Sequence, residues 1–219
     1  MLRVVVYDLR DAFDQSVLSP AEQQRVERFA SQDAARRWAA GRCGLRQVLA
    51  DAVGADPAAL ELTRGPHGKP ALASSDLRFN KSDSGELAAV ALSDGREVGL
   101  DVEAHRDVKR SERIAARFFS DAEQEALATL PVDERRQAFF DCWTVKEAVL
   151  KCDGGGLGAM PMASFSAPLG AQWQGQISAR WWGARLQIAT GVSGAVVLEG
   201  TDEARPTVTY RKAGASAPG

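Results

Sequence analysis

The sequence predicts an α+β protein, in which helices and strands are interleaved without a regular strand–helix–strand period. Two observations favour this class. Apolar residues alternate in short runs near the start, in the middle and in the last third of the chain, which is typical of strands. Between these runs lie long segments with the helical period, each with a clear helix start or helix stop.

The charge balance excludes a protein that binds nucleic acid through a globally basic surface. The 219 residues include 27 Lys and Arg against 29 Asp and Glu, a net charge of −2. No apolar run approaches the roughly 20 residues of a membrane helix, and the start lacks the basic-then-apolar order of a signal peptide. Cys43, Cys142 and Cys152 show no metal-ligand spacing. We therefore expect a cytoplasmic protein with reduced thiols and no nucleic-acid or membrane partner.

The first half is predicted from local signals in chain order. A strand at Leu2–Tyr7 precedes Ser19-Pro20-Ala21-Glu22, which combines an N-cap, a first-turn proline and a capping-box glutamate. A long helix runs from about Asp33 to Val53 and ends at Gly54. The next segments are a Gly/Pro loop at Thr63–Pro70, strands at Leu77–Asn80 and Leu87–Leu92, and a turn at Ser93–Gly95.

The second half begins with a strand at Glu97–Glu103. Helices follow at Ser111–Phe119, from the capping box Ser120-x-x-Glu123 to before Pro131, and from Glu134 to Cys152, before Gly154-Gly155-Gly156. Antiparallel strands are expected at Gln174–Arg180, Ala184–Thr190, Ala195–Glu199 and Thr207–Arg211. We find no convincing sequence repeat. The turn near residue 95 predicts halves at 1–95 and 96–212, with a disordered tail at 213–219.

Two acidic residues, Asp101 and Glu103, share one face of the strand at Glu97–Glu103 because apolar residues take the alternate positions. A hard divalent cation would relieve their mutual repulsion. For this segment alone, a solvated strand face is the favoured interpretation.

The helix at Glu134–Cys152 carries charge on its apolar face. Lys146 falls inside the apolar arc and Glu147 on its edge. A lysine that extends to solvent and a glutamate paired with Lys151 would be the structural explanation. We favour a functional one, because Lys and Glu are rarely buried without a partner.

Basic residues gather in the first half. Between Arg25 and Arg46 there are six arginines and two acids, which is usually a solvated helix face. Lys69, after Gly68, offers a cation in a turn. Beside an acidic strand, these groups are compatible with a phosphorylated ligand and a divalent metal.

Four segments, in chain order, resemble motifs of the Sfp-type 4′-phosphopantetheinyl transferases. They are Gly68-Lys69-Pro70, Val98-Gly99-Leu100-Asp101-Val102-Glu103, Arg117-Phe118-Phe119-Ser120-x-x-Glu123 and Trp143-Thr144-Val145-Lys146-Glu147-Ala148-Val149-Leu150-Lys151. The resemblance spans about Ser19 to Phe165. Each motif is weak alone, but the ordered set is very specific.

The resemblance implies two similar α+β halves related by pseudo-twofold symmetry, with the active site at their interface. It implies a monomeric transferase that moves the phosphopantetheine arm of coenzyme A onto a serine of an acyl or peptidyl carrier protein and releases adenosine 3′,5′-bisphosphate. Asp101, Glu103 and Glu147 would bind Mg²⁺. Glu147, Lys151 and Asp101 would be catalytic, with Glu147 as candidate base. Whether the carrier serves fatty-acid, polyketide or nonribosomal-peptide synthesis stays open.

The resemblance also implies which residues contact coenzyme A. They are Arg25, Arg37, Arg42, His67, Gly68, Lys69, Asn80, Lys81, Ser82, Asp83, Asp101, Lys146 and Lys151. One departure matters: the family has F-N-x-S-H-S, with a histidine on coenzyme A phosphate, where this chain has Asp83. Lys81 compensates for this negative charge, or the affinity for coenzyme A is reduced. Glu22 also replaces a lysine that some members have.

A basic stripe follows the acidic strand. Arg110, Arg113 and Arg117 lie at i, i+3 and i+7, and they suit an acidic carrier helix as well as they suit a solvated face. Two other functions remain open: a coenzyme A-binding protein without transfer activity, because of Asp83, and a Mg²⁺-dependent pyrophosphate hydrolase.

Overall fold

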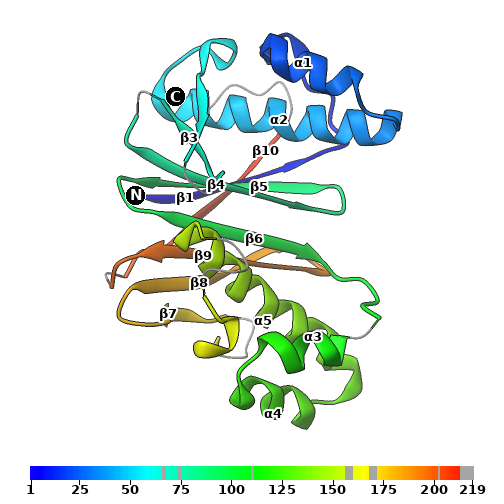
Figure 1. Ribbon diagram of the computed structural model, residues 1–219, viewed down its shortest axis with the longest axis vertical. Coiled ribbons are helices and arrows are strands. Elements are labelled where there is room, and N and C mark those ends of the chain that lie inside the picture. Colours follow the sequence, from blue (N-terminus) through cyan, green and yellow to red (C-terminus); the bar gives the residue numbers. More distant parts are fainter. Residues whose placement is uncertain are drawn as a thin grey trace.

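The computed structural model describes residues 1–65, 68–73, 75–109, 111–155, 160–167, 172–201 and 203–212. Two sheets lie between outer layers of helices (Figure 1). The elements are mixed helices and strands, so the α+β prediction is confirmed. Within these residues, no helix combines the length and apolar character that a membrane span needs.

The first sheet has the strand order β10-β1-β5-β4, and α2 lies against its outer face (Figure 1). β1 is antiparallel to β5, and β5 is antiparallel to β4. The short pair β2 and β3 follows α2. The elements on this side are β1 (Leu2–Asp8), α1 (Pro20–Glu27), α2 (Gln32–Val53), β2 (Leu62–Arg64), β3 (Pro70–Leu72), β4 (Leu77–Ser84), β5 (Leu87–Asp94) and β10 (Thr207–Arg211).

The second sheet has the order β6-β9-β8-β7 and is antiparallel throughout, with α5 on its outer face (Figure 1). Its elements are β6 (Val98–Ala104), α3 (Ser111–Phe118), α4 (Asp121–Thr129), α5 (Val132–Asp153), β7 (Gln174–Gln176), β8 (Trp181–Ala189) and β9 (Val192–Glu199). Short 3₁₀ helices are at Gln15–Val17, Pro57–Ala59 and Met162–Ser164.

The predicted helix ends are confirmed where the sequence supplies caps. Ser19 and Ser120 each form a complete capping box at the start of α1 and α4. Gly54 and Gly154 end α2 and α5 in the left-handed conformation, with φ of 67° and 79°. Glycine adopts this conformation without the steric penalty of a Cβ atom.

Several strand predictions were inaccurate. β4 extends to Ser84, past the predicted end at Asn80, because Lys81–Ser84 continue the backbone ladder with β5. β8 begins at Trp181, before the predicted start at Ala184. The predicted loop at Thr63–Pro70 contributes residues to the small β2–β3 pair at both ends.

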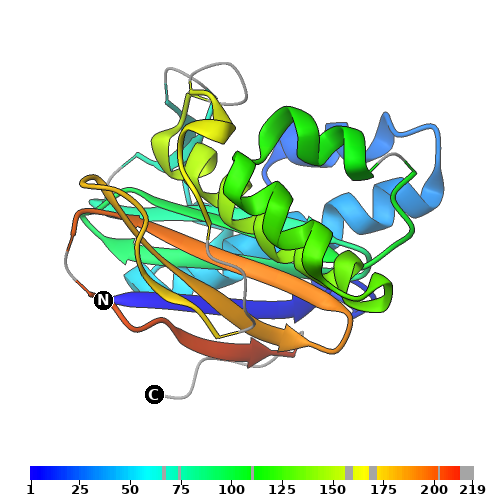
Figure 2. The same cartoon turned by 90° about the horizontal axis from the view of Figure 1, so that it is seen from below.

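The predicted pairing of the last strand, β10, was wrong. Thr207–Arg211 was expected to be antiparallel with the other C-terminal strands, but it pairs in parallel with β1, with Val4 opposite Val208. Figure 2 shows β10 beside β1, far along the sequence but adjacent in space. Alternation predicts a strand but does not identify its neighbour, because β pairing is a tertiary choice. The division at residue 95 stays a prediction, and residues 213–219, expected to be disordered, lie outside the described residues.

The two halves repeat one arrangement that the sequence comparison within the chain did not reveal. The orders β1-β5-β4 and β6-β9-β8 are the same, and α2 and α5 both have 22 residues. In each half the capping-box glutamate, Glu22 or Glu123, pairs with a buried cation of the long helix, Arg46 at 2.7 Å or Lys146 at 2.8 Å. Two similar halves are therefore confirmed, although no repeat was recognised in the sequence.

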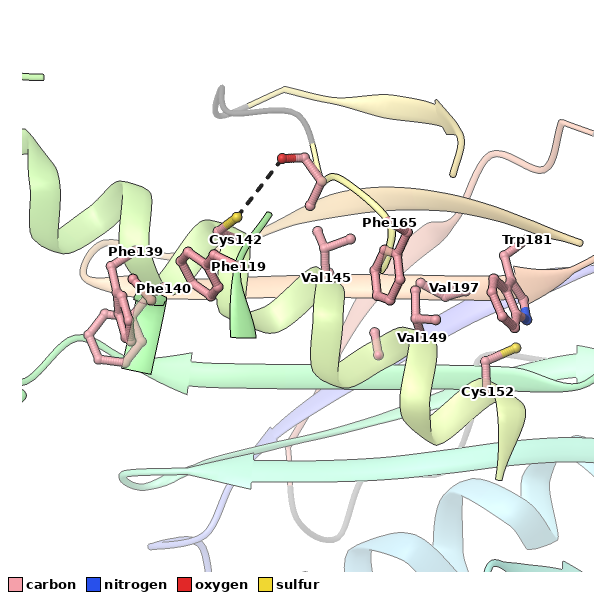
Figure 3. Packing of buried hydrophobic residues seen from close by; sticks show 14 of the residues in the cluster. Phe119, Phe139, Phe140, Cys142, Val145, Val149, Cys152, Phe165, Trp181 and Val197 are labelled. Carbon is pink, nitrogen blue, oxygen red and sulfur yellow. Dashed lines mark hydrogen bonds between the residues drawn. The ribbon is translucent and has the colours of Figure 1, made fainter. Parts of the chain in front are cut away.

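Three apolar layers fill the spaces between helices and sheets. One lies between α2 and the first sheet, one between the two sheets, and one beneath α5. Figure 3 shows the third layer, where Val145 and Val149 of α5 lie near Phe165, Trp181 and Val197. Burying an aliphatic or aromatic side chain in this way contributes about 1.5–3 kcal/mol. This packing fixes α5 across the second sheet.

Candidate active site

β6 turns its acidic face toward α5. Val98, Leu100 and Val102 are buried in the layer between the sheets, so Asp101 and Glu103 point to the opposite face, as the alternation predicted. Asp101 is only 5% exposed. A solvated strand face, the favoured interpretation for this segment alone, is therefore wrong for Asp101.

Gly99 allows α5 to approach this face closely. A Cβ atom at Gly99 would lie 1.9 Å from the carbonyl oxygen of Ala148 and 2.4 Å from the nitrogen of Cys152. Such distances are impossible for real atoms, so only glycine permits this crossing. The contact brings Glu147 and Lys151 of α5 beside the carboxylates of β6.

Asp101 has one fully bonded oxygen and one without a partner. Its Oδ1 accepts hydrogen bonds from Lys151 Nζ at 2.6 Å and from Ser82 Oγ at 2.9 Å. Its Oδ2 is buried and has no hydrogen-bond partner. Burial raises the pKa of Asp101, although Lys151 and Ser82 both favour the ionised form. A buried oxygen without a partner is costly and is the feature that a bound cation would satisfy.

Glu103 and Glu147 complete an acidic cluster around Asp101. Glu103 accepts hydrogen bonds from Ser84 at 2.7 Å and Arg106 at 2.6 Å. Burial raises the pKa of Glu147, and the negative charge of Asp101 raises it further. Among the described residues, no three acidic, histidine or cysteine side chains are arranged so that they could hold a metal ion. The donor set is nevertheless the oxygen-only chemistry that Mg²⁺ prefers, and Mg²⁺ often uses only one or two protein carboxylates.

The predicted coenzyme A residues divide between this cluster and a pocket of the first half. A pocket of about 440 Å³ brings together Arg37, Arg42, Asn80, Lys81 and Asp83. Arg25, also predicted, lies near it, with its guanidinium 5.3 Å from the ring of Trp38, which lines the pocket. His67 and Arg110 lie outside the described residues.

The cations of this pocket already have acidic partners. Arg37 pairs with Glu86 at 2.9 Å, and Arg42 pairs with Glu22 at 3.2 Å. Lys81 pairs with Asp83, the residue that departs from the family pattern. Burial lowers the pKa of Arg42, and the nearby charges of Arg46, Arg64 and Arg25 lower it further, while Glu22 opposes them. An anionic ligand in this pocket would therefore have to compete with these acidic partners for the cations.

Gly68 and Lys69 directly precede β3, and the side chain of Lys69 reaches the start of β6. Lys69 Nζ donates to Glu97 at 2.7 Å and to the carbonyl of Val98 at 2.9 Å. It lines a second pocket of about 320 Å³ with Gly154, at the end of α5. Gly68 has a φ of 81° in the turn before it. Lys69 therefore connects the β2–β3 pair to the start of β6.

The structure does not support the contact with coenzyme A that was predicted for Lys146. Its side chain is completely buried, and Nζ bonds to Glu123 and to the carbonyls of Met162 and Phe165, each at 2.7–2.8 Å. It therefore holds the segment around Met162–Phe165 against α5. The apolar helix face required a partner for this charge, as expected, but the partner is the capping box of α4.

Sequence reasoning missed several residues of the site. Trp38, which lines the pocket of the first half, carries only a weak sequence signal, since it lies in a helix with an ordinary structural explanation. Ser84 and Arg106, which were not predicted, donate hydrogen bonds to the Glu103 carboxylate. The alternation of Asn80, Ser82 and Ser84 was visible in the sequence, and its spacing of two residues matches that of Asp101 and Glu103. That match could have identified Ser84.

Comparison with known proteins gives the family. The model described as the 4′-phosphopantetheinyl transferase superfamily matches residues 97–197, and the model of the N-terminal region of a 4′-phosphopantetheinyl transferase matches residues 10–94. The chain is 32% identical to 4′-phosphopantetheinyl transferase Sfp of Bacillus subtilis over 164 residues, which are 74% of this chain and 70% of that protein.

Two other relatives are matched over a smaller part of their length. The chain is 38% identical over 146 residues to 4′-phosphopantetheinyl transferase HetI of Nostoc, covering 65% of this chain and 62% of HetI. It is 37% identical over 120 residues to AcpT of Escherichia coli K12, covering 54% of this chain and 58% of AcpT. The match thus spans less than two thirds of these two relatives. Both family models and the similarity to Sfp show that this chain belongs to the 4′-phosphopantetheinyl transferase family.

Proposed function

We propose that this protein transfers the 4′-phosphopantetheine arm of coenzyme A to a serine hydroxyl of an apo acyl or peptidyl carrier protein, with Mg²⁺ as the metal. The observation that carries the proposal is the cluster at the junction of the halves. There Asp101 has a buried oxygen without a partner, Lys151 lies 2.6 Å from its other oxygen, and Glu147 is nearby with a raised pKa. The family relationship supplies the reaction class.

Asp101, Glu103 and Glu147 would hold the Mg²⁺ ion. The free oxygen of Asp101 fits a cation. Burial raises the pKa of Glu147, the negative charges of Asp101 and Glu103 raise it further, and this repulsion is what a cation removes. When bound, the ion would supply positive charge to the oxygens of the pyrophosphate.

The residues of the chain itself would then orient and deprotonate the nucleophile. Glu147 would accept the proton of the carrier serine, directly or through water, and its raised pKa improves it as a base near neutral pH. The serine oxygen forms a bond to the phosphorus that carries the pantetheine. The bond from that phosphorus to the bridging oxygen breaks, and adenosine 3′,5′-bisphosphate leaves with the electron pair. Lys151 would bind a phosphate oxygen that carries this negative charge.

The pocket of the first half would receive the nucleotide end of coenzyme A. Arg37, Arg42 and Lys81 line it together with the ring of Trp38. A phosphate would compete with Glu86, Glu22 and Asp83 for these cations. Lys69 would contribute from the neighbouring pocket.

The carrier would dock at α3. Arg113 and Arg117 are exposed on this helix, next to the end of β6, and an acidic carrier surface complements them. We further propose that the protein acts as a monomer in the cytoplasm, since both halves that form the site belong to one chain and its three cysteines are free.

The test is the intact mass of an apo carrier protein incubated with this protein, coenzyme A and Mg²⁺. We expect a gain of one phosphopantetheine arm. The variant Glu147→Gln should lower the transfer rate by about 10²- to 10⁴-fold, the usual effect of losing a general acid or base. Gln47→Ala is the matched control, because Gln47 has the same place in α2 that Glu147 has in α5, and it should change the rate little.

A coenzyme A-binding protein without transfer activity is the second candidate, because Asp83 forms an ion pair with Lys81, a cation that would otherwise be available to a phosphate. It predicts binding of coenzyme A without any mass gain across several carriers, and recovery of transfer by Asp83→His. Cleavage of coenzyme A in the absence of a carrier would instead indicate a pyrophosphate hydrolase. Either result would overturn the proposed transfer.

A further inference from the structure

The two sheets are joined along β4 and β6 by side chains. No backbone ladder connects these strands in the described sheets. Instead, alternate side chains of β4 accept hydrogen bonds from alternate N–H groups of β6: Asn80 Oδ1 from Leu100 at 2.8 Å, Ser82 Oγ from Val102 at 3.3 Å and Ser84 Oγ from Ala104 at 3.1 Å. These side chains replace the carbonyls that a neighbouring strand would supply.

Two of these side chains also contact the acidic cluster. Ser82 Oγ donates to Asp101 at 2.9 Å, and Ser84 Oγ donates to Glu103 at 2.7 Å. Both pairs have a spacing of two residues, so the register of the junction places one hydroxyl on each carboxylate. Side chains of β4, in the first half, therefore hold the carboxylates of β6, in the second half.

The bonds of Ser82 determine which oxygen of Asp101 is free. Ser82 Oγ accepts from the N–H of Val102 and from Lys151 Nζ at 3.1 Å. A hydroxyl has two acceptor positions and one proton, so its proton is directed to Asp101 Oδ1. Lys151 donates to the same oxygen at 2.6 Å. Both donors hold Oδ1, and Oδ2 remains buried and without a partner.

We propose that Ser82 is a positioning residue that fixes the Asp101 carboxylate so that its Oδ2 is available to a divalent cation. This role is distinct from the direct contact with coenzyme A predicted for Ser82, and it rests on the proposed metal-dependent function. Residues that orient a metal ligand in this way typically account for 10- to 100-fold in metal affinity or activity.

The experiment measures Mn²⁺ binding to the whole protein, without coenzyme A or carrier, by the loss of the free Mn²⁺ electron paramagnetic resonance signal. Ser82→Ala should weaken Mn²⁺ binding by about 10- to 100-fold. Ser82→Thr, which keeps the hydroxyl, should recover most of the affinity. Ser93→Ala is the matched control, since it removes another buried serine hydroxyl, from β5, and should bind Mn²⁺ as the wild type does.

A double variant separates positioning from a general loss of structure. If Ser82 acts through Asp101, then adding Ser82→Ala to Asp101→Asn should cause no further loss of Mn²⁺ affinity, whereas a general loss of structure would lower the affinity again in that background. Wild-type affinity in a folded Ser82→Ala variant would overturn the inference. Absence of Mn²⁺ binding by the wild type would instead overturn the metal site on which it rests.

Discussion

In the first half α2 packs on β1, and in the second half α5 packs on β6. The paired helices have 22 residues each and the paired strands seven, so their positions can be compared directly. Where β6 has Asp101 and Glu103, β1 has Val5 and Tyr7. Both Val5 and Tyr7 are buried in an apolar layer under α2. One fold thus carries an acidic cluster on one side and an ordinary core on the other.

The helices α2 and α5 also differ at corresponding positions. Glu147 and Lys151 of α5 correspond to Gln47 and Asp51 of α2. Asp51 pairs with Arg211 of β10, and β10 closes the edge of β1 with a parallel backbone ladder. The corresponding edge of β6 meets the polar side chains of β4. The two halves share one backbone arrangement, and the acidic cluster lies where the edge strand is bonded by side chains instead of by a backbone ladder.

The largest effect we expect on stability comes from the buried ion pair that both halves share. Lys146→Met should lower the free energy of unfolding by about 3–5 kcal/mol, because it leaves Glu123 buried without its partner. Arg46→Met should cost less, because the side chain of Glu22 is 13% exposed against 3% for Glu123. Urea denaturation measures both values.

A rescue variant checks the cause of this loss. Glu123→Gln combined with Lys146→Met removes the unpaired charge and should recover part of the stability. An unchanged free energy of unfolding in Lys146→Met would show that the pair is not a shared structural device.

A medium effect is expected from glycines at which helix and strand approach each other. Gly99→Ala should destabilise by about 3 kcal/mol, the upper end of the usual cost of overpacking, since its Cβ would meet the backbone of Ala148 and Cys152. Gly44→Ala should cost less, because its Cβ would meet the ring of Tyr7, which can shift more readily than a helix backbone. Thermal unfolding compares them, and a larger loss at Gly44 would contradict the argument.

The smallest effect is a difference in pH dependence, measured without metal. Burial raises the pKa of Glu147, so the folded protein binds its proton more tightly, and stability falls as pH rises above the ordinary value of 4.5. Burial also acts to raise the pKa of Glu22, but the hydrogen bond from Arg46 and other favourable contacts outweigh it, and the net shift is downward. Its stabilisation is therefore present above 4.5 and is lost as pH falls.

Two variants separate these opposite dependences of stability on pH. Relative to the wild type, Glu147→Gln should gain stability as pH rises through the window above 4.5, and Glu22→Gln should show a loss that shrinks as pH falls below it. Urea denaturation across pH 3 to 8 measures both. Parallel curves for the two variants would contradict the assigned shifts.

Local structure was determined by the sequence. The capping boxes at Ser19 and Ser120, and the stops at Gly54 and Gly154, act within one turn of backbone, so nearby residues suffice to predict them. The alternation along Val98–Glu103 likewise places the carboxylates on one face without any knowledge of the fold. The ordered motifs indicated the family in advance.

Only the tertiary structure decided which elements supply the partners. Lys146 finds its acid on another helix, β10 adds to β1 in parallel, and Ser82 reaches Asp101 across the junction of two sheets. These contacts join residues far apart in the chain, and their cost in chain entropy is recovered only when the whole core packs. Periodicity shows which face a side chain occupies, whereas packing determines what that face meets.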